Sequence, residues 1–203
     1  MEPVLDQTLR AQARALSPGG GVAIDDALAA GLDRYLELLV LWNRRINLSS
    51  VRDAAGIVEK HFVDSLAALP HVPASAKTLV DVGSGGGFPG AVLALARPAL
   101  AVTLLEPVHK KAAFLEALRR ELPLPNVTVA IGRAETTATR ADVAISRATW
   151  DLGEWLERGA GLVVPGGVVL GMEGAEEHAL PPGATRHPYR LGRAARAIVV
   201  WRR

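Results

Sequence analysis

The sequence predicts a doubly wound α/β fold with a mainly parallel sheet and helices on both faces, preceded by a helical N-terminal extension. From Thr78 onward, short runs rich in β-branched residues alternate with helical segments, which is typical of a parallel α/β sheet. Before Thr78, apolar residues recur at the three- and four-residue steps of amphipathic helices. With 203 residues, 49% of them hydrophobic and 22% charged, the chain can bury the core of one domain.

The extension is expected to be helical over most of its length. Residues 26–42 carry an apolar stripe from Leu28 to Leu39 and are predicted to form an amphipathic helix. Further helices are expected over 54–69 and, more briefly, over 1–16.

The rest of the chain is expected to alternate strand and helix. The predicted strands are 78–82, 101–105, 127–131, 141–146 and 167–171. The predicted helices are 90–96, 110–122 and 152–158. After residue 171 the alternation ends, and a strand at 195–201 is expected to close the sheet as part of an antiparallel hairpin.

Composition excludes some classes of chemistry. The chain has no cysteine, so disulfides, thiolate metal sites and cysteine nucleophiles are excluded. The start, Met1-Glu2-Pro3, lacks the basic and apolar segments of a signal peptide, and no apolar run is long enough to span a membrane, so a cytoplasmic protein is expected. The basic residues are 19 arginines and four lysines. This bias favours RNA as a partner, because guanidinium groups bind phosphate in a bidentate manner; a GC-rich genome would explain it equally well.

A glycine loop, Gly83-Ser84-Gly85-Gly86-Gly87-Phe88-Pro89-Gly90, follows the first predicted strand. Without a Cβ atom, glycines let a ligand lie against the main chain, and the helix expected next offers unpaired N–H groups. Glu106 ends the second predicted strand, at the right distance along the chain to bind ribose hydroxyls. The sequence therefore predicts a site for a nucleoside cofactor.

Two cofactor classes fit this loop. Residues 85–90 match G-x-G-x-x-G, the pattern of dinucleotide-binding proteins. Asp81 favours S-adenosylmethionine, because its carboxylate would lie near the ammonium and sulfonium groups of that cofactor and would repel a pyrophosphate. We therefore favour a methyltransferase, and a nicotinamide-dependent oxidoreductase using the same loop remains the alternative.

Several further motifs resemble one methyltransferase family. W-N-x-x-x-N-L begins at Trp42 and H-x-x-D-S-L begins at His61. Matching blocks are found at 41–53, 61–66, 81–90, 110–115, 133–135 and 146–148. Together they resemble the glucose-inhibited division protein B type of methyltransferase. The resemblance implies a Rossmann-like class I methyltransferase domain over 73–203, an RNA-facing extension over 1–72, and methylation of guanine N7 in bacterial 16S ribosomal RNA.

The resemblance also implies roles for single residues. Gly83, Gly85 and Phe88 would contact S-adenosylmethionine, and Glu106 would bind its ribose. Ala134 and Glu135 would lie at its adenine end, and Arg147 would lie near the acceptor as the catalytic residue. The stretch Met172-Glu173-Gly174 departs from the family, which usually has a lysine-glycine pair there. The missing lysine is the one feature that favours a non-catalytic RNA-binding module.

Basic side chains indicate where RNA would bind. Arg44, Arg45 and Arg52 are the predicted phosphate contacts of the extension, and six arginines without an acid follow from Arg186 to Arg203. A solvated basic surface would have the same composition. The expected partner is small-subunit ribosomal RNA or an assembling 30S particle, bound by a monomer.

Polar residues of the extension are interpreted as structural. Trp42 is expected in the core, and Asn43 and Asn47 are expected to tie their helix to the catalytic domain. His61 and Asp64 share one helix face but lack further metal ligands, so an interdomain polar contact is expected and no metal site.

Overall fold

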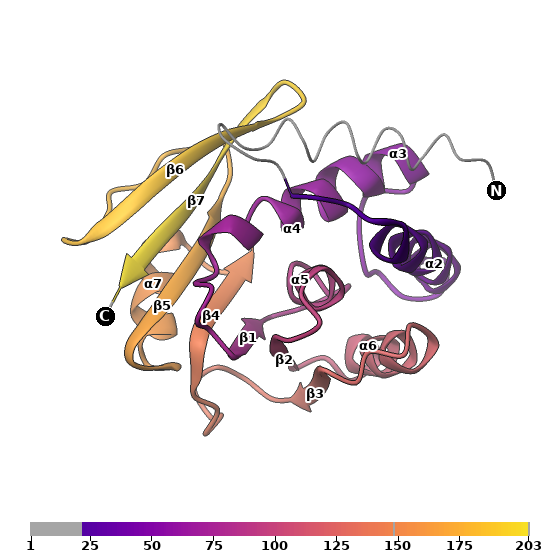
Figure 1. Ribbon diagram of the computed structural model, residues 1–203, viewed down its shortest axis with the longest axis horizontal. Helices are drawn as coiled ribbons and strands as arrows, with labels where there is room; N and C mark the ends of the chain where they lie inside the picture. The colour runs from indigo at the N-terminus through magenta and orange to yellow at the C-terminus, as the bar shows by residue number, and fades with distance from the viewer. Residues whose placement is uncertain (1–21, 148, 203) are drawn as a thin grey trace.

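One mixed sheet forms the centre of the molecule. The computed structural model describes residues 22–147 and 149–202, so the helix expected over 1–16 lies outside the described residues. The sheet has seven strands in the order β3-β2-β1-β4-β5-β7-β6 (Figure 1). The strands are β1 (Thr78–Val82), β2 (Ala101–Glu106), β3 (Val127–Ile131), β4 (Ala141–Arg147), β5 (Val163–Glu173), β6 (Ala184–Leu191) and β7 (Ala194–Arg202).

Helices cover both faces of the sheet, as the sequence predicts. They are α2 (Asp26–Asn43), α3 (Ala54–Ile57), the π-helix η1 (Val58–Val63), α4 (Asp64–Leu66), the 3-10 helix η2 (Leu69–His71), α5 (Gly90–Ala96), α6 (His109–Glu121) and α7 (Leu152–Ala160). Helices α2 and α4 pack on α5, which lies with α6 on one face of the sheet, and α7 packs on β4 and β5 (Figure 1).

Alternating side chains of the strands build one core on each face. In β1, Leu79 packs with Leu36 and Leu93 of the helices α2 and α5, whereas Val80 packs with Leu156 of α7. Both faces of β1 are therefore covered, which explains why four of its five residues are buried. Because Leu36 belongs to the same core as the sheet, the N-terminal helices are packed against the rest of the fold.

The C-terminal hairpin confirms the antiparallel closure predicted from the sequence. Strands β6 and β7 pair antiparallel across a turn in which Gly192 has a φ of 57°, and β7 pairs antiparallel with β5. Strand β5 is longer than the predicted 167–171, because its pairing with β4 begins at Val163. The register shifts between that pair, Ala141 with Val163, and the next one, Val143 with Val168. The positive φ of Gly166 accommodates the irregular backbone, so Pro165 and Gly166 do not end the strand.

The single helix predicted over 54–69 is wrong in its details. Six residues from Val58 to Val63 form a π-helix between two short α-helical pieces. A π-turn contains about one more residue than an α-turn, and such turns are frequent at functional sites. Here it carries the carbonyl of Lys60, the ring of His61 and the neighbouring Asp64 to a common partner on β4.

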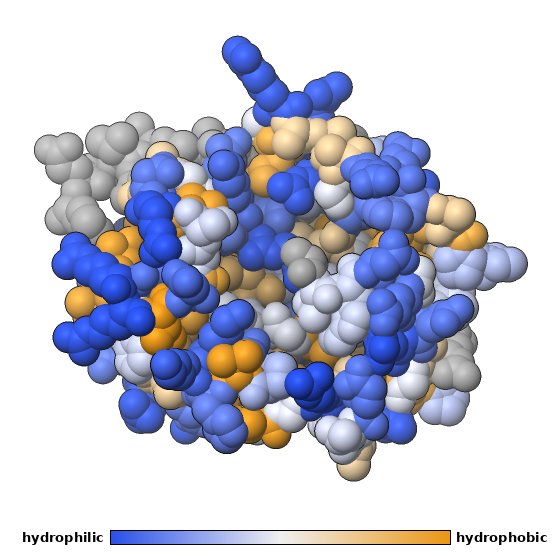
Figure 2. Space-filling model, turned by 180° about the vertical axis from the view of Figure 1, so that it is seen from behind, coloured by the Kyte–Doolittle hydropathy of each residue, from blue (hydrophilic) through white to orange (hydrophobic). Residues whose placement is uncertain are grey.

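One face of the molecule is mostly hydrophilic. Figure 2 shows blue side chains over most of one face, with orange apolar groups in small separate patches around a central hollow. Over the described residues, no helix is both long and apolar enough to cross a membrane.

Candidate active site

The glycine loop has the backbone that its sequence demands. Gly83, Gly85 and Gly87 have φ angles of 73°, 57° and 90°, which side chains with a Cβ rarely adopt. A Cβ at Gly87 would also collide with the hydroxyl of Tyr35, and one at Gly90 would lie 2.6 Å from the Cβ of Asp81. The loop is therefore packed closely on its inner side.

Tyr35 supports this loop from the N-terminal extension. Its side chain is fully buried, and its hydroxyl donates a hydrogen bond to the carbonyl oxygen of Gly86. Burial raises the pKa of Tyr35 well above its ordinary value, so the phenol remains a donor. Tyr35 lies on the apolar stripe of the helix predicted over 26–42, and the helical spacing does not indicate what its hydroxyl contacts.

Asp81, a predicted cofactor contact, lies near the end of β1. Its side chain is fully buried beneath the loop, where Oδ2 accepts a hydrogen bond of 2.9 Å from the Gly90 amide. Its Oδ1 atom has no hydrogen-bond partner among the described residues. Burial raises the pKa of Asp81 to about 7, against the opposing effect of the Gly90 amide. The carboxylate does not line the cavity described below.

Glu106 lies at the end of β2 with its carboxylate held by backbone amides. Oε2 accepts from the Gly85 amide at 2.8 Å, and Oε1 accepts from the Val108 amide at 2.9 Å. The residue is 3% exposed and contributes to the cavity wall. Since a carboxylate oxygen has two lone pairs, each oxygen can still accept a bond from a ligand hydroxyl.

A cavity of about 440 Å³ opens between the glycine loop and the ends of β2 and β4. One side consists of Gly83, Gly85 and Glu106, and the other side includes His61 and Arg147. Clefts at the carboxyl ends of parallel strands are the usual ligand sites of such sheets, and this volume is in the usual range for small-molecule sites. A larger concavity of about 730 Å³ lies between η2 and the β6–β7 hairpin, and none of the predicted cofactor-site residues lines it.

Arg147 is the centre of a polar network at the end of β4. Its Nη1 atom donates to the Lys60 carbonyl and to Oδ2 of Asp64, both at 2.9 Å. The Asp64 carboxylate is 2% exposed and also accepts a bond of 2.6 Å from the Tyr189 hydroxyl. The network therefore joins the extension, the sheet and the C-terminal hairpin, which confirms the interdomain polar contact expected for His61 and Asp64.

His61 has a defined proton arrangement. A guanidinium group only donates, so Nδ1 of His61 accepts the bond of 3.0 Å from Nη2 of Arg147. The ring proton is therefore assigned to Nε2, which lies 2.6 Å from Oγ of Ser49. Burial, followed by the charge of Arg147, lowers the pKa of His61 to about 4. His61 is thus neutral near pH 7 and has no free lone pair to accept a proton from a substrate.

Phe88 connects this network to the glycine loop. Its ring stacks on the imidazole of His61, with centroids 4.6 Å apart, and on the ring of Tyr35, with centroids 5.3 Å apart. The guanidinium carbon of Arg147 lies 5.3 Å from the Phe88 centroid. The predicted site residues Phe88 and Arg147 are therefore neighbours, joined by a cation–π contact and by the ring of His61, which contacts both.

The W-N-x-x-x-N-L motif stabilises the chain that leads to this network. Oδ1 of Asn43 accepts bonds from the amides of Leu48 and Ser49, and its Nδ2 donates to the Ser49 carbonyl. Trp42 packs on the core, edge-on to Phe114, as expected. The tie formed by Asn43 is thus local, and it positions Ser49 for its contact with His61.

Other predicted residues lie outside the cavity. Ala134 and Glu135 do not line it, and Glu135 forms an ion pair with Arg158. Arg44 and Arg45 are exposed at the end of α2. Arg52 is also exposed, but it donates to the Asn43 carbonyl and to Oδ1 of Asn47.

The tail arginines are not equivalent. Arg186 is not a free phosphate contact, because its guanidinium donates to both carboxylate oxygens of Glu173, at 2.6 and 3.0 Å. Glu173 is 4% exposed, so the residue at the position of the family's lysine is turned inward. Sequence analysis missed this buried pair, since the two residues are 13 positions apart and meet only through the pairing of β5, β6 and β7.

The fold is similar to that of solved methyltransferases. A methyltransferase from Geobacter sulfurreducens superposes with a TM-score of 0.58 at 15% identity, over 88% of this chain and 96% of that one. A SAM-dependent methyltransferase from Aquifex aeolicus superposes with a TM-score of 0.55 at 16% identity, over 71% and 92% of the chains. At these identities the likeness concerns the fold, and it confirms the predicted class of sheet.

Sequence similarity is much closer. Proteins named ribosomal RNA small subunit methyltransferase G, from Burkholderia pseudomallei (strain 668) and Burkholderia mallei (strain NCTC 10229), are each 43% identical over 176 residues. Each alignment covers 81% of this chain and 76% of the relative. Residues 29–181 match the model of the family described as rRNA small subunit methyltransferase G. The chain belongs to the rRNA small subunit methyltransferase G family.

Proposed function

We propose that this protein transfers the methyl group of S-adenosylmethionine to N7 of a guanine in small-subunit ribosomal RNA. Family membership supports the reaction class and the RNA substrate. The observation that carries the proposal is the cavity of about 440 Å³, which has the glycine loop and Glu106 on one side and Arg147 on the other. The choice of guanine N7 rests on the family resemblance of the motifs around Trp42 and His61.

The residues of the cavity fit S-adenosylmethionine. The backbone of Gly83 and Gly85 would lie against the cofactor, Phe88 would close one side, and Glu106 would accept bonds from ribose hydroxyls. Ala134 and Glu135, in the segment after β3, are proposed for the adenine end. When bound, the cofactor supplies an electrophilic methyl group next to a positive sulfur.

The residues of this chain would mainly orient the reaction. Guanine N7 has a free lone pair and no proton, so no general base is needed. Aligning N7 with the methyl group can contribute up to ~7–11 kcal/mol in favourable cases. Arg147 stays protonated and would position the acceptor or the cofactor. Its ion pair with Asp64 offsets the positive charge beside a base that becomes cationic.

We propose that the chain consists of an N-terminal extension, residues 1–72, and a methyltransferase domain, residues 73–203. RNA would approach the site over the extension. Arg44 and Arg45 are exposed at the end of α2, and exposed Arg52 lies in the segment between α2 and α3. Such side chains bind phosphates without reading the base sequence. We further propose that the protein acts as a monomer in the cytoplasm. Its substrate would be ribosomal RNA or an assembling 30S particle.

The two alternatives lack a supporting observation. The nicotinamide-dependent oxidoreductase shares the G-x-G-x-x-G pattern, but the chain belongs to a methyltransferase family. The non-catalytic module was favoured by Glu173 in place of a lysine. Because Glu173 is buried and paired with Arg186, that departure has a structural explanation.

A pair of glycine variants tests the cofactor site. Gly85 and Gly166 both have a positive φ, and neither has an atom close to an added Cβ, but only Gly85 lines the cavity. Gly85→Ala and Gly166→Ala should each cost about 1–2 kcal/mol of stability. Only Gly85→Ala should weaken S-adenosylmethionine binding in calorimetry, and NADH should bind neither protein. Equal affinity in both variants would count against the site.

The reaction itself is tested on ribosomal particles. Mass spectrometry of small-subunit RNA from cells with and without the gene reports the modified base. The expected difference is one 7-methylguanosine, restored when the purified protein and S-adenosylmethionine are added to unmodified particles. Methylation at another atom would contradict the choice of N7, and no methylation would contradict the proposed function.

A further inference from the structure

A second, smaller cavity borders the cofactor cavity. Its volume is about 220 Å³, and Arg147 and Thr149 line both spaces. The two cavities are therefore neighbours at the end of β4, and an acceptor in the smaller cavity would lie beside a cofactor in the first. None of the proposed cofactor contacts other than Arg147 lines the smaller cavity.

The smaller cavity has aromatic and polar walls. Trp150 and Trp155 line it with their rings nearly parallel, at a centroid distance of 5.7 Å and an angle of 15°. Asp151, Glu173, His178 and Arg196 line the polar part. Nucleobases have flat apolar faces and polar edges, and proteins that modify a base bind it between aromatic groups and read its hydrogen-bonding edge.

The volume limits the occupant. At ~30 Å³ per water molecule, 220 Å³ corresponds to about seven waters. This is below the ~300–1,000 Å³ of sites that bind larger ligands, so a single ring system fits and a second cofactor does not.

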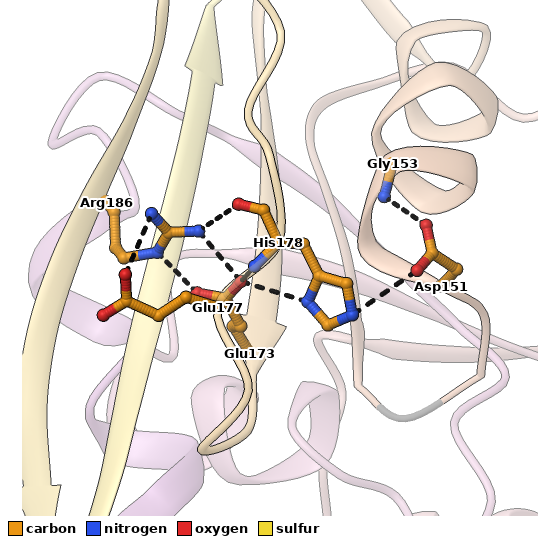
Figure 3. A network of polar contacts seen from close by, with 6 residues as sticks. All are labelled: Asp151, Gly153, Glu173, Glu177, His178 and Arg186. Atoms are coloured by element: carbon orange, nitrogen blue, oxygen red, sulfur yellow. Dashed lines mark hydrogen bonds and ion pairs between the residues drawn. The ribbon is translucent and has the colours of Figure 1, made fainter.

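Of the two carboxylates on the polar wall, that of Glu173 is nearly inaccessible to a ligand, with an exposed side-chain fraction of 1%. Both oxygens of Glu173 are bound by Arg186, and Oε1 also accepts from the His178 amide. Figure 3 shows His178 between this pair and Asp151, at the start of α7. In Asp151, Oδ1 accepts from the Gly153 amide at 2.9 Å, whereas Oδ2 has a contact of 3.5 Å with Nε2 of His178. Oδ2 of Asp151 is thus the acceptor that a ligand can reach, and its side chain is 59% exposed.

A carboxylate at this place discriminates among bases. Guanine carries two adjacent donors, N1–H and N2–H, on its Watson–Crick edge. Adenine, cytosine and uracil each present an acceptor beside their donor, and that acceptor would face the carboxylate unfavourably. N7 of guanine lies across the ring system from N1 and N2. A guanine held by this edge therefore turns N7 away from Asp151.

We propose that the cavity beside Trp150 receives the acceptor guanine and that Asp151 selects it through N1–H and N2–H. This inference rests on the proposed function and adds the residue that sets base specificity. Asp151 would act by binding the base, and it takes no proton in the reaction.

The substitution Asp151→Asn tests this assignment without removing the helix cap. Asparagine is as good an N-cap as aspartate, so its oxygen keeps the bond from the Gly153 amide. Its NH₂ group then replaces Oδ2 and presents donors to the donors of guanine. Asp25→Asn is the matched control, because Asp25 caps α2 through the Leu28 amide and lines neither cavity.

The assay measures methyl transfer to two kinds of unmodified particle. In one, the acceptor nucleotide is guanosine. In the other, it is inosine, which is introduced by RNA ligation and lacks the 2-amino group. Wild type and Asp25→Asn should prefer guanosine, and Asp151→Asn should lose this preference. Its kcat/KM on guanosine should fall roughly 5- to 150-fold, the range for one bidentate base contact. S-adenosylmethionine affinity should stay unchanged in all three proteins.

Two results would overturn the proposal while leaving the proposed function intact. One is a wild type that methylates guanosine and inosine equally well. The other is an Asp151→Asn protein with the same preference for guanosine as the wild type. A wild type that methylates neither particle contradicts the proposed function itself and takes the guanine assignment with it.

Discussion

The guanidinium of Arg147 and the carboxylate of Asp64 meet at 2.9 Å, and this contact joins the end of β4 to the N-terminal helices. Both groups are largely withdrawn from water, with exposed side-chain fractions of 16% and 2%. The hydroxyl of Tyr189, in the C-terminal hairpin, donates a hydrogen bond to the same carboxylate. Three segments that are distant in sequence thus converge beside the cofactor cavity.

Replacing Asp64 by asparagine should destabilise the fold strongly. The change leaves the charge of Arg147 without its buried partner, and breaking such a pair typically costs about 3–5 kcal/mol. Glu37→Gln is the control, since it removes one of the two exposed carboxylate partners of Arg34 and should cost about 0–1 kcal/mol. Urea unfolding measures both, and similar losses in the two variants would contradict the importance of burial.

His61 should make stability depend on pH on the acid side. Its pKa falls from 6.5 to about 4 in the folded protein, so the folded state binds the proton less readily than the unfolded chain. The stabilising contribution is complete above pH 6.5 and is lost as the pH falls through 4. The change amounts to roughly 3 kcal/mol. In urea unfolding between these pH values, His61→Gln should show a shallower decline than wild type, and an equally steep decline would refute this interpretation.

The rate of methyl transfer should be nearly independent of pH. Guanine N7 has no proton to lose, and His61 has its Nδ1 lone pair occupied by Arg147. Single-turnover rates measured between pH ~6 and ~9 should therefore be flat. A rise dependent on one proton that vanishes in His61→Gln, Asp64→Asn or Glu135→Gln would show that a base takes part, and would argue against N7.

RNA binding should weaken steeply with salt, and Arg44 and Arg45 should contribute to that dependence. Each lost phosphate contact lowers the slope of log K against log salt by ~0.7–0.9, so Arg44→Ala with Arg45→Ala should lower it by about 1.4–1.8. The double variant Arg120→Ala with Arg140→Ala is matched in charge and lies at exposed positions of α6 and of the segment before β4. Equal slopes in both double variants would place the RNA elsewhere.

The sequence by itself determined the fold class, the glycine loop and the family. Strand and helix follow from the spacing of apolar residues, which is a local property, so the parallel sheet and the closing hairpin were predictable. The loop was predictable because only glycine suits its positive φ angles. Glu106 could be proposed as a cavity residue from its place at a strand end.

Only the tertiary structure decided which polar groups meet. Asp81 precedes the glycine loop in sequence, but its side chain is buried beneath the loop and does not line the cavity. The π-turn of η1, which brings Lys60, His61 and Asp64 to Arg147, contacts β6 and the end of β4, and helix periodicity does not reveal these contacts. Likewise, Glu173 meets Arg186 through strand register. Hydrogen bonds and ion pairs depend on distances of a few ångströms between segments far apart along the chain, and no local pattern of residue types contains that information.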